Sequence, residues 1–579
     1  MAVRRGVWLV VALLVLAFMI SAAGLVFTSL MISGEPQIAG NSTLLLKVTG
    51  DLSEIEPGGV FGPFLEPPPT VRSLTESLRK AKVDRRVTSV IVRPSGTAAL
   101  WGKVQEVRDA ILDFRSSGKP IVAFLEFGGE QEYYLASACD KVFLMPTASL
   151  DLTGIASYEL FLRGTLDKIG AYPDVLHVGE YKTAANTFTE RTYTPSHREM
   201  AQSLNSNLYE QLVNGVAESR HKSVDEVRAL IDHGPFLPED AIRAGLIDDV
   251  AYEDEIDDKV SLGGGTQRFV SMDDYRRINP RSVGLNKGPR IAVIYAVGMI
   301  TSGESSDDAA TGQSVGSDTI VEHLRKVRAD NSVKAVVLRV DSPGGSAIAS
   351  DIIWREVVLT REKKPVIASM SDVAASGGYY ISMPAHKIVA QPATLTGSIG
   401  VVMIKFAIGG TLEKLGMNME RVTNGKYADL WAPDRPFTPE ERKKIEASMH
   451  ATYETFVEKA AAGRKTTPER IDSIAQGRVW TGAQAKQHGL VDELGGLDRA
   501  LVLAKQAAGI NEKSEVELVV YPQRRSFYEL FQAPFGTDSG VIGTLLGIRD
   551  RRAVQTLTAP LRFFRRGEPL ALMPNVFVR

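Results

Sequence analysis

Short runs of apolar, β-branched residues alternate with amphipathic segments over most of the chain. The runs at 89–92 and 335–340 have the length and composition of buried strands. Apolar residues recur at helical spacing over 104–114 and 348–359. Strands that alternate with helices predict right-handed βαβ units around a mainly parallel sheet. The expected fold class is therefore α/β.

This pattern occurs twice along the chain. Residues 78–81 resemble residues 324–327, which gives an offset of 246 residues (324 − 78). The pair Tyr133-Tyr134 matches Tyr379-Tyr380 at the same offset. Several matches at one constant offset are not expected by chance, so the sequence predicts two tandem repeats. Early in the second copy, the Gly- and Ser-rich stretch 301–317 predicts a loop.

The N-terminus carries a long apolar run. Arg4 and Arg5 precede an almost unbroken apolar stretch over 6–32, long enough to cross a bilayer as a helix. The arginines favour a cytoplasmic N-terminus, with the rest of the chain on the outer side. The alternative is a cleaved signal peptide with 21–23 as its cleavage site, but apolar residues continue past that point. Both interpretations predict export.

The organisation that follows has five parts. We expect a transmembrane anchor at 1–33, an N-terminal repeat at 45–260, a linker at 261–289, a C-terminal repeat at 290–515 and a basic tail at 516–579. The arginine-rich tail is compatible with contact to lipid headgroups, with contact to a neighbouring subunit, or with a plain solvated face.

Composition narrows the classes of function. Hydrophobic residues make up 44% of the chain and charged residues 23%, as in globular proteins. The net charge of -2 argues against nucleic acid as the main partner. Cys139 is the single cysteine, which excludes an intramolecular disulfide and a cysteine metal cluster within one chain.

The differences between the two copies point to chemistry. At the offset of 246 residues, Ser376 of the second copy corresponds to Glu130 of the first. Conversely, Lys182 of the first copy corresponds to Ala428 of the second. One copy therefore keeps a serine and the other keeps a lysine.

Ser376 has the surroundings of a nucleophile. It follows the apolar run 365–370 and stands between alanines and glycines, at a predicted strand-to-helix corner. Small neighbours at such a corner expose the hydroxyl and leave room for another chain. The alternative is a glycine-rich turn with a capping serine.

A serine hydroxyl needs a base to take its proton. No histidine flanks the motif, and we interpret His386 as structural. A lysine serves as base if burial lowers its pKa. A lone lysine is usually a surface residue, and only the reciprocal loss across the repeats favours Lys182 for this task.

A glycine pair supplies the third requirement. Gly344 and Gly345 close the loop Asp341-Ser-Pro-Gly-Gly345 after a predicted strand, whereas the first copy has only Pro94-Ser-Gly96 there. Backbone amides in such a loop stabilise a developing oxyanion. The alternative is a proline-glycine turn without a function.

Together these motifs resemble one family. Asp341-Ser-Pro-Gly-Gly345, Asp372-Val-Ala-Ala-Ser-Gly-Gly-Tyr379, Thr396-Gly-Ser-Ile-Gly400 and Gly179-Glu-Tyr-Lys-Thr183 are similar to the motifs of signal peptide peptidase A (protease IV), in its long, duplicated form. The resemblance implies a Ser-Lys dyad, with Ser376 as nucleophile, Lys182 as general base and Ser398 holding the lysine. It also implies an oxyanion hole made by Gly344 or Gly345 and the Ser376 amide.

The resemblance carries further expectations. It implies two ClpP/crotonase-like repeats, each built as an α/β spiral. It also implies a homotetramer that contacts the lipids of a bacterial inner membrane. The catalytic domains would lie on the periplasmic side, anchored by a single span. The activity would be that of a serine endopeptidase that degrades the signal peptides left after preprotein cleavage, without metal or organic cofactor.

Two other functions compete with this one. A crotonase-like acyl-CoA hydratase or isomerase shares the fold and the oxyanion hole, with Glu130 as its carboxylate, but export places it away from CoA. A non-catalytic membrane scaffold would oligomerise through the repeats, with Ser376 and Lys182 as turn and surface residues.

Overall fold

The computed structural model describes residues 35–56, 68–260, 268–308, 312–523, 570–573 and 577–578, and the single positions 16 and 24. The predicted anchor at 1–33 therefore lies outside the described residues, apart from those two positions, as does most of the tail. Among the helices of the described part, none has the length and apolar character to cross a membrane.

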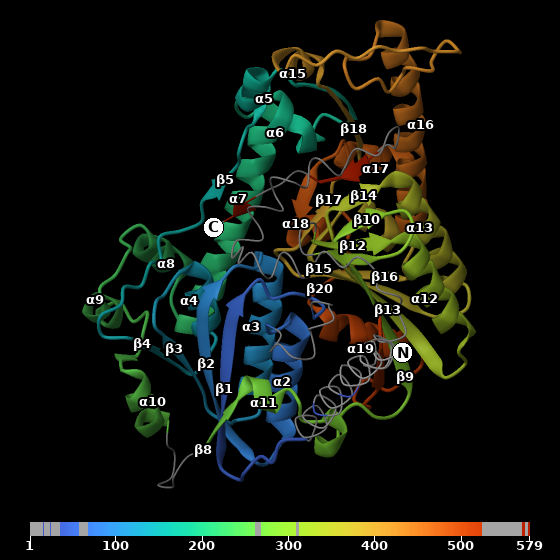
Figure 1. The fold of residues 1–579 in the computed structure, drawn as a ribbon. Helices are drawn as coiled ribbons and strands as arrows, with labels where there is room; N and C mark the ends of the chain where they lie inside the picture. Colours follow the sequence, from blue (N-terminus) through green and yellow to red (C-terminus); the bar gives the residue numbers. More distant parts are fainter. Residues whose placement is uncertain are drawn as a thin grey trace, which may run out of the picture.

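The N-terminal repeat is built on a parallel six-stranded sheet of order β7-β4-β3-β2-β1-β8 (Figure 1). Its strands are β1 (Ser42–Gly50), β2 (Val87–Thr97), β3 (Ile121–Leu125), β4 (Lys141–Leu144), β7 (Asp249–Val250) and β8 (Arg268–Ser271). The helices α2 (Val71–Val83), α3 (Trp101–Arg115) and α4 (Glu130–Ala136) pack on this sheet. The predicted α/β class is confirmed.

The C-terminal repeat has an eight-stranded sheet whose main path is β19-β17-β15-β13-β9-β21, with β16 and β20 beside β15. The strands are β9 (Arg290–Val297), β13 (Val333–Ser342), β15 (Val366–Ala375), β16 (Lys387–Ala390), β17 (Leu395–Gly397), β19 (Val479–Thr481), β20 (Glu493–Leu494) and β21 (Glu517–Tyr521). Its helices include α12 (Ser317–Ala329), α13 (Ala347–Arg361), α14 (Gly377–Ser382) and α19 (Leu497–Ala507).

Both faces of this second sheet are buried, which explains why its strands read as continuous apolar runs. On β9, Ala292 and Ile294 lie in the same core as residues of α12 and α13. Ile291 and Val293 pack with residues of α19 in a separate core. Alternate residues of one strand thus serve two different layers of helices.

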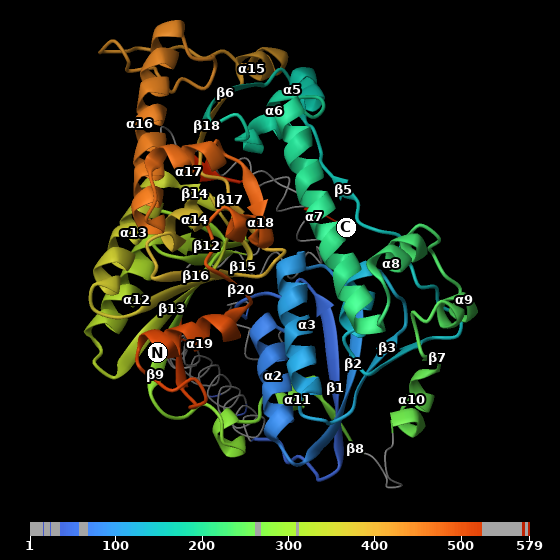
Figure 2. The same cartoon turned by 180° about the vertical axis from the view of Figure 1, so that it is seen from behind.

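The bounds of the elements repeat as the sequence predicts. Helices α2 and α12, helices α3 and α13, and strands β4 and β16 begin and end at positions 246 residues apart. The long helices α7 (Pro195–Arg220) and α16 (Pro439–Arg464) also correspond and are equally long. The two repeats stand side by side, with α16 at the outer edge of the C-terminal repeat and α7 nearer the middle of the molecule (Figures 1 and 2).

The stretch 301–317 is predicted to be a loop by the sequence, and this prediction is wrong for much of the stretch. It contains β11 (Ser306–Asp308) and β12 (Gly312–Gly316), and β12 pairs in parallel with β10 (Met299–Thr301). A side chain at Gly298 would lie 1.9 Å from the carbonyl oxygen of Gln313. Within the stretch, a side chain at Gly316 would lie 2.1 Å from the carbonyl carbon of Glu304. Glycine at these two positions therefore allows backbone segments to approach closely.

Two further segments carry strands. Within the expected linker, β8 pairs with β1, and within the expected tail, β21 pairs in parallel with β9. Each extends the sheet of the repeat beside it.

A third sheet joins the two repeats. Its order is β11-β12-β10-β14-β22-β18-β6. The C-terminal repeat contributes β14 (Gly344–Ser346) and β18 (Val401–Ala407), and the C-terminal tail contributes β22 (Leu570–Leu572). The N-terminal repeat contributes β6 (Tyr172–Val178). Strands β6 and β18 pair antiparallel over their full lengths, with Val178 opposite Val401. This ladder fixes the register between the repeats.

A buried ionic cluster lies at the same boundary. The guanidinium of Arg339, on β13, is fully buried and donates to Glu54 and to Glu106, each at 2.7 Å. Glu106 belongs to α3 of the N-terminal repeat and also accepts from the Leu497 amide at 2.9 Å. Charges are buried at such a site only when they are paired and hydrogen-bonded.

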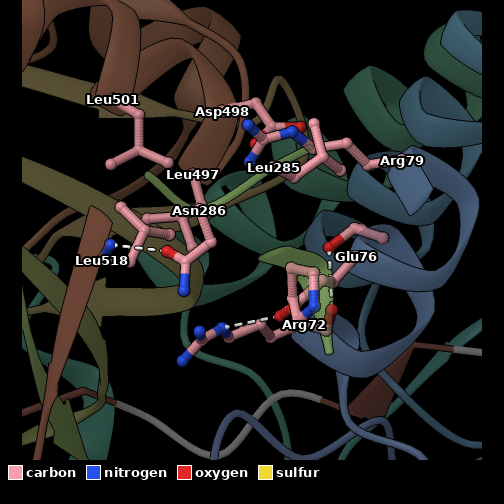
Figure 3. A pocket seen from close by; sticks show the side chains of 11 residues that line it. Arg72, Glu76, Arg79, Leu285, Asn286, Leu497, Asp498, Leu501 and Leu518 are labelled. Carbon is pink, nitrogen blue, oxygen red and sulfur yellow. Dashed lines mark hydrogen bonds and ion pairs between the residues drawn. The ribbon is translucent and has the colours of Figure 1, made fainter. Parts of the chain in front are cut away.

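A small pocket, shown in Figure 3, is lined in part by Leu497, whose amide donates to Glu106 of this cluster. It is lined by side chains of α2 and α19, among them Arg79 and Leu501, and by Asn286, whose side chain accepts from the Leu518 amide at 2.8 Å. Its cavity volume of about 30 Å³ has room for a few water molecules at most. It is too small for a substrate.

We predict that Arg339→Leu destabilises the protein strongly, because two carboxylates then remain buried without their partner. The expected loss is about 3–5 kcal/mol in the free energy of unfolding, measured by thermal or urea denaturation. The matched control is Arg243→Leu, which removes a surface ion pair with Asp240 and should leave the unfolding midpoint unchanged. Equal effects of the two substitutions would contradict the assignment.

Candidate active site

Ser376 stands at the corner between β15 and α14. It is the N-cap of α14, with φ 55° and ψ -112°. A residue with a side chain seldom adopts a positive φ, and such strain gathers at functional sites. Its side chain is fully buried, and its amide donates to the Gly397 carbonyl at 2.8 Å. The predicted strand-to-helix corner is present, in the form of a sharp elbow.

Lys182 lies in the loop after β6, in the other repeat. Its Nζ atom is 2.8 Å from the Oγ atom of Ser376, although the two residues are 194 positions apart in the chain. The same Nζ atom is 2.8 Å from the carbonyl oxygen of Ser398 and 3.0 Å from its Oγ atom. The structure therefore brings together the three side chains that the sequence singled out.

The ladder between the repeats explains this meeting. With Val178 opposite Val401 in an antiparallel pair, residues that follow β6 lie beside residues that precede β18. Lys182 follows the first strand and Ser398 precedes the second. The Tyr181 amide also donates to the Gln476 carbonyl at 2.8 Å, which anchors the lysine loop to the C-terminal repeat.

Two glycines make room for the lysine. A side chain at Gly477, where φ is 76°, would lie 2.5 Å from the Cβ atom of Lys182. A side chain at Gly400 would lie 3.1 Å from its Cδ atom. The lysine stem thus runs across bare backbone of the C-terminal repeat, which is why it comes so close to Ser398.

Burial sets the protonation of Lys182. The side chain is 1% exposed, and loss of solvent lowers its pKa well below the ordinary value of 10.5. A neutral amine has two N–H donors and one lone pair. It can donate to both oxygens of Ser398 and accept the hydroxyl proton of Ser376, so all three neighbours find a partner.

The glycine pair lies against the nucleophile. Gly344 and Gly345 form β14 with φ values of 104° and 150°. A side chain at Gly344 would lie 2.7 Å from the Gly377 amide nitrogen, and one at Gly377 would lie 3.2 Å from the Gly345 nitrogen. The glycine loop and the start of α14 are therefore in close contact beside Ser376, where an oxyanion hole would lie. The Gly344 amide donates to the Ser342 hydroxyl at 3.2 Å.

One detail of the expected oxyanion hole needs correction. The Ser376 amide points away, since it donates to the Gly397 carbonyl. The Gly377 amide is in the first turn of α14, where amides have no intrahelical acceptor. Gly377 is thus the better donor, and the positive φ at Ser376 is what turns the two amides in different directions.

A second ionic cluster holds the surrounding backbone. Lys103 of α3 lies 2.7 Å from a carboxylate oxygen of Asp341, which in turn accepts from the Val373 amide at 3.1 Å. Asp372 accepts from the amides of Leu100 and Lys103 at 3.0 and 2.7 Å. Burial raises the pKa of Asp372 to about 6, although the charge of Lys103 opposes it. The glycine loop and the strand before Ser376 are thereby tied to the other repeat.

Sequence reasoning missed several of these residues. Gly477 and Lys103 carry no local signal, because their importance comes from contacts across the boundary between repeats. Gly377 and Gly400 stood inside recognised motifs without an assigned task. In the described part of the chain, no group of three or more His, Cys, Asp or Glu side chains is arranged to hold a metal ion.

Comparison with known families bears on this site. The model of peptidase family S49 matches residues 113–263 and 359–511, one segment in each repeat. The chain belongs to this family. The second S49 segment contains Ser376 and Ser398, and the first contains Lys182.

Relatives agree with the S49 assignment. The chain is 39% identical to the chloroplastic serine protease SPPA of Arabidopsis thaliana, over 83% of this chain and 72% of that protein. It is 35% identical to protease 4 of Salmonella typhi, over 76% of this chain and 72% of that protein. A putative signal peptide peptidase SppA of Enterococcus faecium is 35% identical over 34% of this chain and 57% of that protein. The protein is a serine peptidase.

We predict that Gly477→Ala abolishes most peptidase activity while the fold persists, because the new methyl group displaces Lys182. Activity should fall at least about 100-fold, the order of effect that loss of catalytic positioning produces. Gly489→Ala is the matched control, since Gly489 has a similar φ of 79° but open space around it. The control carries the same backbone strain and should keep its activity. Equal losses would show that strain, and not the lysine, is responsible.

We also predict that Lys182→Met stabilises the protein at neutral pH. Unfolding restores the ordinary pKa of 10.5, so at any pH between the lowered folded pKa and 10.5 the unfolded chain binds a proton that the folded chain has lost. Stability therefore rises with pH between the lowered folded pKa and 10.5, and the wild type is penalised below that window. The variant should melt higher at pH 7, and the gap should shrink as pH approaches 10.5. A gap independent of pH would contradict a neutral lysine.

Proposed function

We propose that this serine peptidase is an endopeptidase with a Ser-Lys dyad assembled from its two repeats. Ser376 is the nucleophile, Lys182 is the general base and Ser398 orients the lysine. The observation that supports this best is the contact of 2.8 Å between the Nζ atom of Lys182 and the Oγ atom of Ser376, inside a buried site. A surface lysine would be protonated and unable to accept the hydroxyl proton.

The mechanism follows from the geometry. Neutral Lys182 takes the proton of the Ser376 hydroxyl, and the oxygen attacks the scissile carbonyl. The oxyanion is stabilised by amides of the Gly344-Gly345 loop and of Gly377. The lysinium then gives its proton to the leaving amine, and water, activated by the same lysine, hydrolyses the acyl-enzyme. No step calls for a metal or an organic cofactor.

Ser398 has a positioning task in this scheme. It accepts two hydrogen bonds from the lysine, through its carbonyl and hydroxyl oxygens. These leave the lone pair of Nζ directed at Ser376. The backbone of Ser398 has a φ of 50°, and its amide donates to the Arg478 carbonyl at 2.7 Å, which holds it in place.

We further propose that the substrates are signal peptides that remain after preprotein cleavage. The name of the Enterococcus relative and the motifs of the family support this. Apolar side chains beside the nucleophile, among them Val373, Ala375 and Leu395, suit a hydrophobic peptide. Glu130, the carboxylate of the competing hydratase, instead accepts from Thr153 at 2.9 Å, within the N-terminal repeat.

The finer expectations on architecture belong to the same proposal. We take each repeat to be a ClpP/crotonase-like spiral and the assembly to be a homotetramer. A single N-terminal span would hold it on the bacterial inner membrane, with the catalytic repeats on the periplasmic side. The apolar run at 6–32 and the resemblance of the motifs support these points.

Cleavage of a fluorogenic apolar peptide tests the dyad. Ser376→Ala and Lys182→Met should each lose at least about 1,000-fold in kcat/KM, as expected when one member of a nucleophile–base unit is removed. Lys182→Arg should be equally inactive, because arginine keeps its proton. For the wild type, kcat/KM should rise with pH through the lowered pKa of Lys182, which burial holds well below 10.5.

A serine-reactive acylating probe provides the control. It should label the wild type at Ser376 and leave Ser376→Ala unlabelled. Retention of most activity in Lys182→Met would mean that another group is the base. Absence of both cleavage and labelling in the wild type would favour a scaffold.

A further inference from the structure

The strand that leads to the nucleophile bulges away from its neighbour just before it reaches Ser376. Between two successive ladder pairs, β13 advances by two residues (340 to 342) while β15 advances by four (370 to 374). A single residue of β13, Asp341, therefore faces residues 371–373 of β15. Such irregularities re-aim the residues that follow them and are common next to active sites. Here the glycine loop follows on one strand and the nucleophile follows on the other.

A side chain replaces the ladder bond that is lost at this bulge. One carboxylate oxygen of Asp341 accepts from the Val373 amide at 3.1 Å. The other oxygen lies 2.7 Å from the Nζ atom of Lys103, which belongs to α3 of the N-terminal repeat. The carbonyl of Asp341 also accepts from the Gly298 amide at 2.9 Å. The separation of the two strands is thus held by an ion pair that crosses the boundary between the repeats.

Asp372, in the middle of the bulge, caps a helix of the other repeat. Helix α3 begins after Leu100, whose side chain makes no capping hydrogen bond. One oxygen of Asp372 accepts from the Leu100 amide at 3.0 Å, and the other accepts from the Lys103 amide at 2.7 Å. Amides of a first helical turn have no acceptor within the helix, and a carboxylate stabilises them. A side chain at Gly102 would lie 3.1 Å from Asp372, so glycine admits this close approach.

The corresponding helix of the C-terminal repeat is capped within its own repeat. Helix α13 begins after Ser346, which lies 246 residues beyond Leu100 (346 − 100). The hydroxyl of Ser346 accepts from the Ala349 amide at 3.0 Å. The two copies of this helix therefore have different tasks. In the first copy, α3 packs on β15 of the second repeat and supports it (Figure 1).

The remaining residue of the bulge is also held from the N-terminal repeat. The Ser371 hydroxyl donates to Glu54 at 2.5 Å and accepts from Arg339 at 3.2 Å. Ser371, Asp372 and Lys103 are all buried. Charged groups at such depth are costly unless they are paired and hydrogen-bonded. Every residue of the bulge thus has a fixed partner, and the contacts of Lys103 reach both strands.

We propose that Lys103 is a positioning residue for the oxyanion side of the active site. Through Asp341 it holds the strand that leads to the glycine pair, and through Asp372 it holds the strand that leads to Ser376. The N-terminal repeat therefore contributes twice: Lys182 acts on the proton of the nucleophile, and Lys103 acts through the two aspartates on the place where the oxyanion forms. The inference rests on the proposed peptidase mechanism and adds a residue to it.

Lys103→Met tests this role with the fluorogenic apolar peptide. Its kcat should fall at least about tenfold while KM changes by less than about twofold, because the oxyanion contact is made only in the transition state. Arg108→Met is the matched control. Arg108 is buried on the same helix, and its hydrogen bonds to Ser137, Gly215 and Ser219 stay within the N-terminal repeat. The control should lower the unfolding midpoint and leave kcat per folded molecule unchanged. Equal losses of kcat would overturn the positioning role.

A pair of inhibitors separates positioning from mere loss of folded protein. With a peptide aldehyde, the Oγ atom of Ser376 bonds to the aldehyde carbon, the π pair of the carbonyl moves to its oxygen, and the serine proton passes to Lys182. The corresponding peptide alcohol cannot form this adduct. In Lys103→Met the Ki of the aldehyde should rise by about the factor by which kcat/KM falls, and the Ki of the alcohol should stay the same. Unchanged Ki values for both, with fewer sites titrated by the acylating probe, would show a purely structural role.

The partner of Lys103 provides a double-mutant cycle. Asp341→Asn keeps an oxygen for the Val373 amide and loses the charge that pairs with Lys103, so it should retain more activity than Asp341→Ala. Lys103→Met combined with Asp341→Asn should be no worse than Lys103→Met alone, since both substitutions break the same contact. Additive losses would contradict a shared contact.

The pH profile reports on the dyad separately. In Lys103→Met the midpoint of kcat/KM against pH should stay at its wild-type position, because the burial that lowers the pKa of Lys182 is unaltered. A shifted midpoint would show that the dyad itself has moved, and would overturn the assignment to the oxyanion side. An active wild type with an unimpaired Lys103→Met would overturn the positioning role and leave the peptidase intact. If the wild type neither cleaves the peptide nor takes the acylating probe, the proposed peptidase fails, and the positioning role fails with it.

Discussion

The proposed chemistry of Lys182 and Ser376 depends on one constraint, the exclusion of water from the Lys182 amine, whose pKa is lowered by burial. Neither repeat can provide this alone, because the lysine loop belongs to one and its surroundings belong to the other. The ladder between β6 and β18 brings the two together, and bare backbone at Gly400 and Gly477 lets them touch. Other contacts between the repeats, such as the ion pair of Lys103 with Asp341, tie the backbone around the site to both repeats.

Two buried lysines show how the surroundings decide the charge. Burial alone lowers the pKa of Lys103, but the charges of Asp341 and Asp372 outweigh it and hold that pKa above its ordinary value. For Lys182 the cause is burial, and its pKa falls. The first lysine is a fixed cation that ties backbone together. In the proposed mechanism the second is the general base. Two lysines in the same region of the protein thus have opposite protonation, because one has carboxylate partners and the other is only buried.

Much of this site was predictable because duplication leaves a record in the sequence. A comparison of the copies singled out Ser376 and Lys182 without any spatial information, and the repeated bounds of α2 and α12 follow from the same register. The sequence could not reveal Gly477 or Lys103, whose partners are distant in the chain. It also could not reveal β22, since three apolar residues in a basic tail predict little. The Ser376 amide was misassigned because its direction depends on a single dihedral angle.

Both members of the proposed dyad belong to one chain, and this affects how activity depends on protein concentration. When two catalytic groups belong to separate subunits, the active fraction follows mass action and falls as the protein becomes scarce. Here the β6–β18 ladder makes the encounter intramolecular, so its effective concentration does not change with the number of molecules present. A single copy of the chain already holds both members of the proposed dyad.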